Sequence, residues 1–215
     1  MRTMISLLVF CLLTVSFPQA IRGEQVVLFL GDSLTAGLGV TPEEAYPHLV
    51  GEKLARDGIS GVRIVNGGLS GATTAGALAR LQWYERIRPD VLFLALGAND
   101  GLRGLDIGTM QDNLEEVIRY AKSRDMTVLL AGMELPPNYG TQYTEAFRTA
   151  YRHLAEQYEL VFIPFLLEGV GGVAALNQAD GIHPNAEGHV VIAHHVYPSL
   201  KQLLEHNQDR YNRGT

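Results

Sequence analysis

The hydrophobic positions of the chain fall into two alternating patterns. Five short runs are continuously apolar or β-branched, which is typical of strands buried on both faces of a parallel sheet. Between and after them, apolar residues recur every three or four positions, as in helices with one buried face. The alternation predicts an α/β doubly wound domain with a five-stranded parallel sheet. The predicted strands are 26–30, 62–65, 91–96, 127–131 and 160–164, and the predicted helices are 45–56, 72–87, 110–123, 141–158 and 186–205.

The N-terminal segment follows a third pattern. Arg2 precedes an apolar run over residues 5–17, and Pro18-Gln19-Ala20 follows it. One positive charge, a short apolar segment and a small residue are typical of a secretory signal peptide, and the run is shorter than the about 20 residues that cross a bilayer. A buried strand or helix start is the alternative. We expect residues 1–20 to be a signal peptide and residues 21–215 to form a single domain of an exported protein, either periplasmic or secreted.

Composition narrows the classes of function. The chain of 215 residues carries 17 Lys and Arg against 23 Asp and Glu, a net charge of −6, and its basic residues do not cluster. Nucleic acids are bound through clustered positive charge, so we expect no nucleic-acid partner. We also expect no stable membrane insertion of the mature chain. The single cysteine, Cys11, lies in the predicted signal peptide, which leaves the mature chain without a disulfide or a cysteine nucleophile.

Polar residues and glycines follow the first three predicted strands. Ser33 comes after the first strand, Gly71 ends the loop after the second, and Asn99 comes after the third. Asp180 and His183 lie in a loop before the last predicted helix. Ligands of doubly wound sheets bind beyond the carboxyl ends of the strands. We therefore expect these residues to meet at that edge.

Together these residue types could carry out acyl transfer. A serine hydroxyl becomes a nucleophile when a base takes its proton and a third group orients that base. Ser33 is the candidate nucleophile, His183 the candidate base, and Asp180, three residues earlier, the candidate orienting group. The backbone N–H groups of Ser33 and Gly71 and the side-chain amide of Asn99 are candidate donors to the developing oxyanion.

Each of these residues has a purely structural alternative. Ser33 could cap a helix, Asp180 and His183 could form an ordinary turn, and Asn99 could also lie in a turn. Gly71 could serve only to allow a positive φ. The joint placement of all of them at one edge of the sheet favours the catalytic interpretation.

Other motifs do not support a cofactor or a metal. The segment 66–71 resembles a dinucleotide fingerprint, but its first glycine is missing and it follows the second strand. Thr35 stands where the nucleophile elbow of an ordinary α/β-hydrolase has its last glycine. His189, His194 and His195 lack the spacing of a metal-binding pair. We expect neither a cofactor nor a metal.

Four blocks occur in order along the chain: Gly31-Asp32-Ser33-Leu34, Gly71, Gly97-x-Asn99-Asp100 and Asp180-x-x-His183. They resemble the four blocks of the GDSL, or SGNH, hydrolases across essentially the whole predicted mature chain. Within that family, the stretches 99–104, 135–140 and 180–184 are similar to the bacterial periplasmic thioesterase I/lysophospholipase/arylesterase group.

The resemblance implies a flavodoxin-like three-layer α/β/α sandwich, the SGNH hydrolase fold. It implies a serine esterase that hydrolyses carboxylic esters and thioesters of acyl chains, with Ser33, His183 and Asp180 as the triad and Gly71 and Asn99 as oxyanion donors. Residues 135–143 would help to bind the acyl chain. The expected partner is a small acyl ester or thioester, and we expect a monomer. A carbohydrate O-acetylesterase with the same machinery and a non-catalytic acyl-chain-binding protein remain as alternatives.

Overall fold

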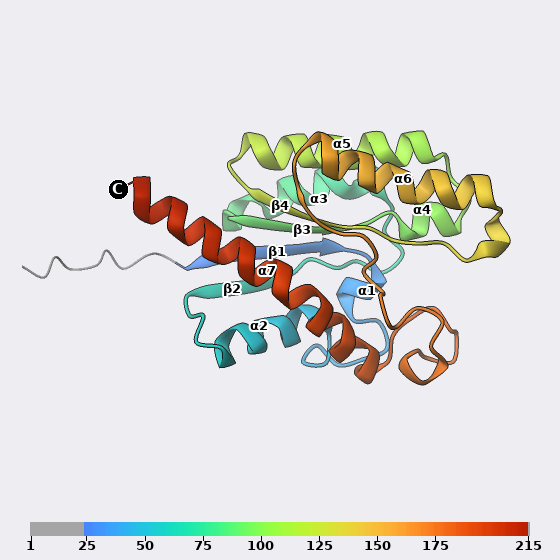
Figure 1. The fold of residues 1–215 in the computed structure, drawn as a ribbon, viewed down its shortest axis with the longest axis horizontal. Coiled ribbons are helices and arrows are strands. Elements are labelled where there is room, and N and C mark those ends of the chain that lie inside the picture. Colours follow the sequence, from blue (N-terminus) through green and yellow to red (C-terminus); the bar gives the residue numbers. More distant parts are fainter. Residues whose placement is uncertain (1–23, 215) are drawn as a thin grey trace, which may run out of the picture.

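The computed structural model describes residues 24–214, and its centre is a five-stranded parallel sheet (Figure 1). The strand order is β2-β1-β3-β4-β5, so the chain reverses its direction of winding after β2. This confirms the predicted parallel α/β sheet, and the predicted strand centres agree with the observed ones. The strands are β1 (Gln25–Gly31), β2 (Val62–Asn66), β3 (Val91–Ala95), β4 (Thr127–Ala131) and β5 (Val161–Ile163).

Helices cover both faces of the sheet, which confirms the three-layer sandwich. Helices α2 and α7 pack together on one face, while α3, α5 and α6 lie on the other (Figure 1). Two short helices, α1 and α4, directly follow β1 and β3 at their carboxyl ends. The helices are α1 (Ser33–Ala36), α2 (Tyr46–Arg56), α3 (Ala77–Tyr84), α4 (Ala98–Leu102), α5 (Ile107–Ser123), α6 (Thr141–Gln157) and α7 (Ala186–Gly214).

The predicted helix 72–87 is wrong in its boundaries. Its start is a loop and the 3₁₀ turn Thr74–Gly76, and its end is the 3₁₀ turn Glu85–Ile87, so that only Ala77–Tyr84 is α-helical. The N-terminal part departs from the helix because Asp100 accepts hydrogen bonds from both the backbone N–H and the hydroxyl of Thr74. These contacts between distant residues hold the loop in another conformation.

Two further boundaries were predicted incompletely. Helix α5 begins at Ile107, earlier than predicted, because the Asp106 side chain caps it by accepting a hydrogen bond from the Thr109 N–H at 2.7 Å. Helix α7 continues past the predicted end to Gly214. The four- and five-residue helices α1 and α4 were not predicted, since they are too short to show a helical period.

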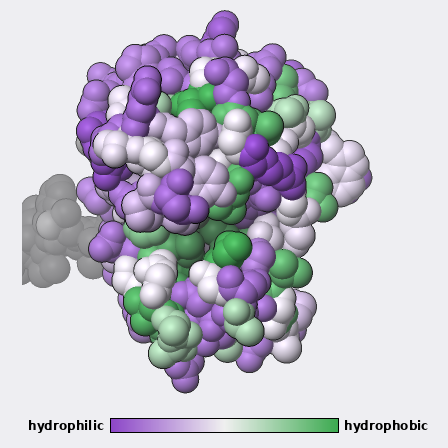
Figure 2. Space-filling view, turned by 90° about the vertical axis from the view of Figure 1, so that its right-hand side faces the viewer, coloured by the Kyte–Doolittle hydropathy of each residue, from purple (hydrophilic) through white to green (hydrophobic). Residues whose placement is uncertain are grey.

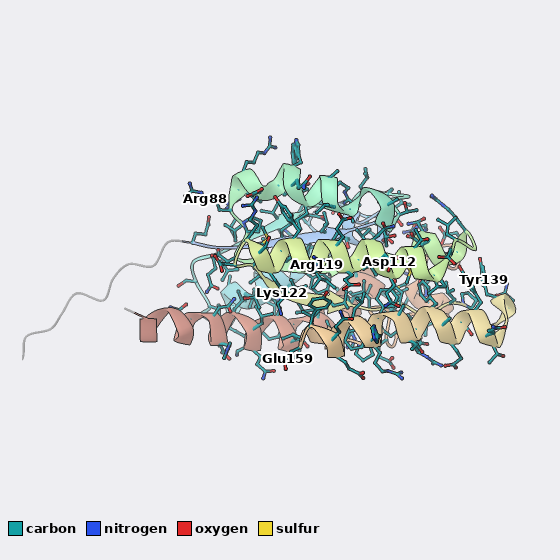
Figure 3. All side chains as sticks on the ribbon, turned by 90° about the horizontal axis from the view of Figure 1, so that it is seen from above. Arg88, Asp112, Arg119, Lys122, Tyr139 and Glu159 are labelled. Atoms are coloured by element: carbon teal, nitrogen blue, oxygen red, sulfur yellow. The ribbon has the colours of Figure 1, made fainter. Side chains whose placement is uncertain are left out.

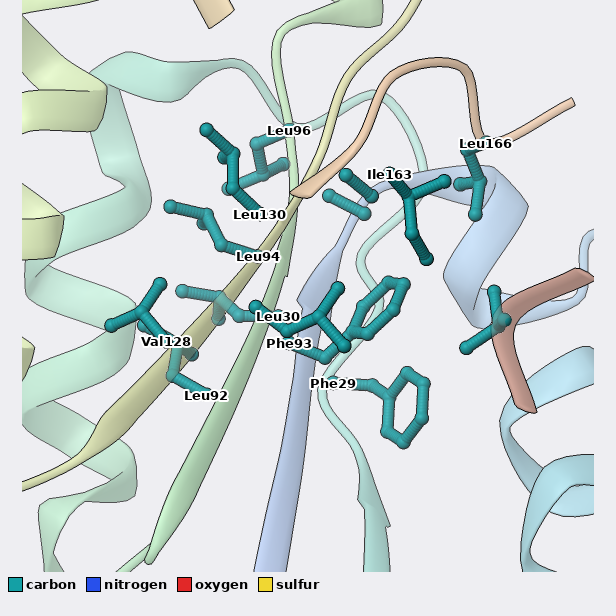
Figure 4. Packing of buried hydrophobic residues seen from close by; sticks show 14 of the residues in the cluster. Phe29, Leu30, Leu92, Phe93, Leu94, Leu96, Val128, Leu130, Ile163 and Leu166 are labelled. Atoms are coloured by element: carbon teal, nitrogen blue, oxygen red, sulfur yellow. The ribbon is translucent and has the colours of Figure 1, made fainter. Parts of the chain in front are cut away.

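The core lies between the central strands and the helices. Phe29 of β1 and Phe93 of β3 are fully buried and stack with ring centroids 4.6 Å apart (Figure 4). Tyr46 of α2 meets the Phe29 ring edge-on at 5.7 Å. Each such buried aromatic ring contributes about 1.5–3 kcal/mol to folding. The strands that lead to the candidate site therefore contribute fully buried aromatic rings to the core.

Candidate active site

Ser33 lies at the point where β1 ends and α1 begins. Asp32 is the N-cap of α1, and its Oδ1 accepts a hydrogen bond from the Leu34 N–H at 3.0 Å. Gly31 must be a glycine, because a Cβ there would overlap the Thr35 side chain and approach the Ala95 carbonyl. The tight turn places Ser33 at the sheet edge, where 9 % of its residue surface is accessible.

His183 and Asp180 meet Ser33 from the loop that precedes α7. The His183 Nε2 lies 3.0 Å from the Ser33 Oγ, and its Nδ1 lies 2.7 Å from the Asp180 Oδ2. The structure thus brings the three predicted residues together across 150 positions of sequence. A histidine held in this way can take the proton of a serine hydroxyl, because its second nitrogen is oriented by a carboxylate.

The loop that carries Asp180 and His183 is closed by its own backbone. Gln178 N–H donates to the His183 carbonyl at 2.7 Å, and Asn177 pairs with Pro184 in an isolated antiparallel bridge. The second carboxylate oxygen of Asp180 accepts hydrogen bonds from the N–H groups of His183 and Ile182. The His183 N–H and side chain, together with the Ile182 N–H, lower the pKa of the Asp180 carboxyl well below its usual value. Asp180 is therefore an anion at neutral pH.

The predicted oxyanion donors come from two loops beside Ser33. Gly71 has a φ of +77°, a conformation that favours glycine. The loop is joined to the end of β1 by the Leu69 N–H, which donates to the Gly31 carbonyl at 3.1 Å. The Asn99 Nδ2 lies 3.4 Å from the Asp32 Oδ2. In residues 24–214, the N–H groups of Ser33 and Gly71 have no hydrogen-bond acceptor within the protein, so both can bind an external oxygen.

Three charged residues near these donors were missed by the sequence reasoning. Asp32 is 2 % accessible, and its burial raises the pKa of the carboxyl to about 6. Asp100 is also buried and holds Thr74, and Arg80 donates to the backbone at the ends of β1 and β2. The sequence signal that could have identified Arg80 is its position as a charged residue on the apolar face of α3, where Ala77 and Leu81 are both buried.

An apolar cavity of about 540 Å³ opens beside the His183 loop. Figure 2 looks onto this end of the molecule, where hydrophobic surface gathers in the hollow across the middle of the face. Tyr139 lies at the same end, near the start of α6 (Figure 3), and its hydroxyl donates to the Leu102 carbonyl at 2.8 Å. The predicted segment 135–143 supplies part of the wall. The lining residues include Leu102, Met133, Leu135, Pro136, Pro137, Tyr139, Phe165 and Ile182.

Within residues 24–214 there is no group of three or more histidine, cysteine, aspartate or glutamate side chains that could hold a metal ion. None of the helices in that part of the chain is both long enough and apolar enough to cross a membrane.

Comparisons with known proteins agree with this geometry. The sequence model of the GDSL-like lipase/acylhydrolase family matches residues 29–191. The chain is 41% identical over 195 residues to esterase TesA of Pseudomonas aeruginosa, which covers 90% of this chain and 96% of that protein. It is 35% identical over 182 residues to thioesterase 1/protease 1/lysophospholipase L1 of Escherichia coli strain K12, covering 84% of this chain and 86% of the other. The crystal structure of TesA superposes with a TM-score of 0.80 at 42% identity, covering 83% of this chain and 99% of that one. The chain belongs to the GDSL-like lipase/acylhydrolase family.

Proposed function

We propose that this protein is a serine esterase that cleaves carboxylic esters and thioesters of acyl chains through an acyl-enzyme on Ser33. As a member of its family, the chain is a hydrolase of ester bonds. The observation that carries the finer proposal is the continuous contact from the Ser33 Oγ to the His183 Nε2 at 3.0 Å and from the His183 Nδ1 to Asp180 at 2.7 Å.

In the first half of the reaction, the Ser33 Oγ attacks the acyl carbonyl carbon while the His183 Nε2 takes the hydroxyl proton. The carbonyl oxygen becomes an oxyanion that accepts hydrogen bonds from the N–H groups of Ser33 and Gly71 and from the Asn99 amide. The tetrahedral intermediate then collapses. His183 gives its proton to the departing alcohol or thiol, and the acyl group stays on Ser33 as an ester.

In the second half, a water molecule takes the place of the leaving group. His183 removes a proton from the water as the water oxygen attacks the acyl carbon, and the same donors bind the new oxyanion. Collapse releases the carboxylic acid, and His183 returns its proton to the Ser33 Oγ. The anionic Asp180 stabilises the imidazolium in both halves, so no cofactor takes part in the proposed reaction.

The substrate class follows from the cavity beside the triad. Leu102, Leu135 and Phe165 offer apolar surface to an acyl chain, and Ile182, the residue before His183, also lines the cavity. Relatives named esterase and thioesterase 1/lysophospholipase L1 support esters and thioesters as substrates. The carbohydrate O-acetylesterase alternative is less well supported, because the single tryptophan, Trp83, is exposed on α3 and stacks with Arg86 outside the cavity. A non-catalytic acyl-chain-binding protein would leave the arrangement of Asp180, His183 and Asn99 without a use.

We also propose that residues 1–20 direct export and are removed, and that residues 21–215 form one catalytic domain that acts as a monomer, in the periplasm or outside the cell. The support is the sequence pattern of the first twenty residues, which lie outside the described part of the chain. N-terminal sequencing of protein from the periplasmic fraction and from the medium tests the export, and analytical ultracentrifugation tests the monomer.

The nucleophile is tested with Ser33→Ala and a matched control, Ser123→Ala. Ser123 is exposed at the end of α5, where its hydroxyl donates to the Tyr120 carbonyl. We expect Ser33→Ala to lower kcat on p-nitrophenyl butyrate by at least about 10³-fold and to abolish labelling by a fluorophosphonate. Ser123→Ala should behave like the wild type. Turnover by Ser33→Ala within tenfold of wild type would exclude the acyl-enzyme mechanism.

A further inference from the structure

Arg80 joins two strand ends beneath the active site. It lies on α3, is half-buried, and its Nη2 donates hydrogen bonds to the Gly31 carbonyl at 2.8 Å and to the Gly67 carbonyl. Its Nη1 is buried, and within residues 24–214 it has no hydrogen-bond partner. A guanidinium with unused hydrogen-bonding capacity in such a place is costly to bury. Burial accordingly lowers the pKa of Arg80, although it stays a cation at neutral pH.

The two carbonyls belong to the segments that carry the reacting groups. Gly31 is the last residue of β1 and precedes the Asp32-Ser33 turn, while Gly67 begins the loop that leads to Gly71. The pairing of β1 with β2 ends at Phe29 and Asn66. Beyond that point Arg80 and the N–H groups of Gly67 and Leu69 hold the two segments together, and the Asn66 amide donates to the Thr35 carbonyl.

The charge of Arg80 also acts on Asp32. The Asp32 carboxylate accepts hydrogen bonds from the Leu34 N–H and, at 3.4 Å, from the Asn99 amide. Burial raises its pKa to about 6. The hydrogen bond from the Leu34 N–H opposes this rise most strongly, followed by the positive charge of His183 and, with the smallest effect, that of Arg80. Two tyrosine hydroxyls, Tyr46 on α2 and Tyr151 on α6, also lie within electrostatic range of Asp32 and are buried neutral groups.

Of His183 and Arg80, only Arg80 is positively charged at every step of the reaction. His183 must be neutral when it waits to accept the proton of Ser33, so it gives Asp32 no positive neighbour at that stage. If Asp32 took up a proton, its hydroxyl could no longer serve as the anionic acceptor for the Asn99 amide. The amide would then lose its charged acceptor, and a neutral carboxyl group would direct it less strongly towards the carbonyl oxygen of the substrate.

We propose that Arg80 is a positioning residue for ester hydrolysis, which fixes the ends of β1 and β2 and keeps Asp32 ionised so that Asp32 orients the Asn99 amide. The proposal rests on the proposed function, because it assigns Asn99 to the oxyanion. Arg80 touches neither the substrate nor the reacting atoms, and it acts through Asp32 and two backbone carbonyls.

The test compares Arg80→Gln, which removes the charge but keeps an N–H donor, with Arg80→Lys, which keeps the charge. Arg86→Gln is the matched control, since Arg86 is exposed and stacks on Trp83. Loss of a complete oxyanion donor costs about 10²–10³-fold in kcat, so a misdirected Asn99 in Arg80→Gln should cost about tenfold or more, with KM nearly unchanged. The acid limb of its kcat profile should move to higher pH, because Asp32 loses a neighbouring cation that lowers its pKa. Arg80→Lys should keep the acid limb of the wild type, and Arg86→Gln should match the wild type throughout.

Two results would overturn the proposal. The first is an Arg80→Gln enzyme with the kcat and pH profile of the wild type. The second is an equal loss of kcat in Arg80→Gln and Arg80→Lys with no movement of the acid limb, because that result would show a merely structural role. If Arg80→Gln does not fold, Asp32→Asn provides the second measurement. Its acid limb must be less steep than that of the wild type, and an identical limb contradicts the proposal. Turnover in Ser33→Ala would instead refute the nucleophile, so the two failures are distinguishable.

Discussion

Replacing Asp180 by asparagine tests how the structure prepares His183. The variant preserves the size of the side chain, and its oxygen can still accept the N–H groups of Ile182 and His183. The amide nitrogen would then occupy the position of Oδ2, which lies 2.7 Å from the His183 Nδ1. A donor there favours the tautomer in which Nδ1 carries no proton and Nε2 does. A protonated Nε2 cannot accept the proton of Ser33.

The magnitude follows from losing this general base while the oxyanion donors remain. Triad enzymes with the wrong histidine tautomer lose about 10⁴-fold in kcat, and single triad losses are not additive. We expect Asp180→Asn to lower kcat by about 10³–10⁴-fold, or about 4–5 kcal/mol of transition-state stabilisation. KM should change little, because Asp180 does not line the cavity beside the site. The loop keeps its backbone hydrogen bonds, so the melting temperature should stay near that of the wild type.

The assay is steady-state hydrolysis of p-nitrophenyl butyrate, together with the rate of fluorophosphonate labelling, which reports the nucleophilicity of Ser33 without deacylation. Asp112→Asn is the matched control, since Asp112 is exposed on the outer side of α5 (Figure 3). Both rates should fall together in Asp180→Asn and stay unchanged in Asp112→Asn. If Asp180→Asn kept a kcat within tenfold of the wild type, the tautomer argument would be refuted.

Three other substitutions test the cavity, the acid stability and the core. Leu135→Phe adds volume to the cavity wall, so kcat/KM for p-nitrophenyl decanoate should fall about tenfold relative to the acetate ester, and an unchanged ratio would place the acyl chain elsewhere. His189 is buried, and burial lowers its pKa from 6.5 to about 4. Between these values only the unfolded state takes the proton, so its contribution to stability is lost as the pH falls from 6.5 towards 4. The measured quantity is the free energy of unfolding in urea of the wild type minus that of His189→Gln. This difference should be about 2 kcal/mol smaller at pH 4.5 than at pH 7.5. The comparison with His189→Gln also distinguishes the effect of His189 from that of Asp32. The raised pKa of Asp32 changes the stability with pH in the opposite direction. Phe93→Ala should cost about 3–5 kcal/mol in the same assay because it leaves a cavity beside Phe29, and a cost below 1 kcal/mol would contradict the packing described for the core.

The strands and the order of the layers could be predicted because their signal is local. A strand buried on both faces is apolar at each position, as in Val91–Ala95, and the loops after such strands carry the polar residues. The rule that these loops meet at one edge was enough to predict that Ser33 and His183 would be neighbours. The 3.0 Å contact between them agrees with that prediction.

The helix boundary at residues 72–77 could not be predicted in the same way. Its sequence has helical spacing, but Thr74 donates two hydrogen bonds to Asp100, which lies 26 positions later. Asn113 of α5 donates to the same threonine hydroxyl at 3.1 Å. Two side chains from other elements therefore decide the conformation of this loop, and neither is visible in a window of local sequence.

The hydrogen bonds of Arg80 show which sequence pattern would have predicted its contact with the strand ends. Arg80 lies between Ala77 and Leu81 on the buried face of α3, and a charge on such a face needs a partner because its burial is costly. The glycine-rich strand ends provide that partner, since Gly31 and Gly67 leave their carbonyl oxygens open to a guanidinium. An arginine on the apolar face of a helix, in a chain with glycines at the ends of its preceding parallel strands, therefore indicates a backbone contact at the catalytic edge. The same reasoning explains why lysine at position 80 should keep the charge but hold the two carbonyls less well, because its single nitrogen lacks the planar fork of arginine.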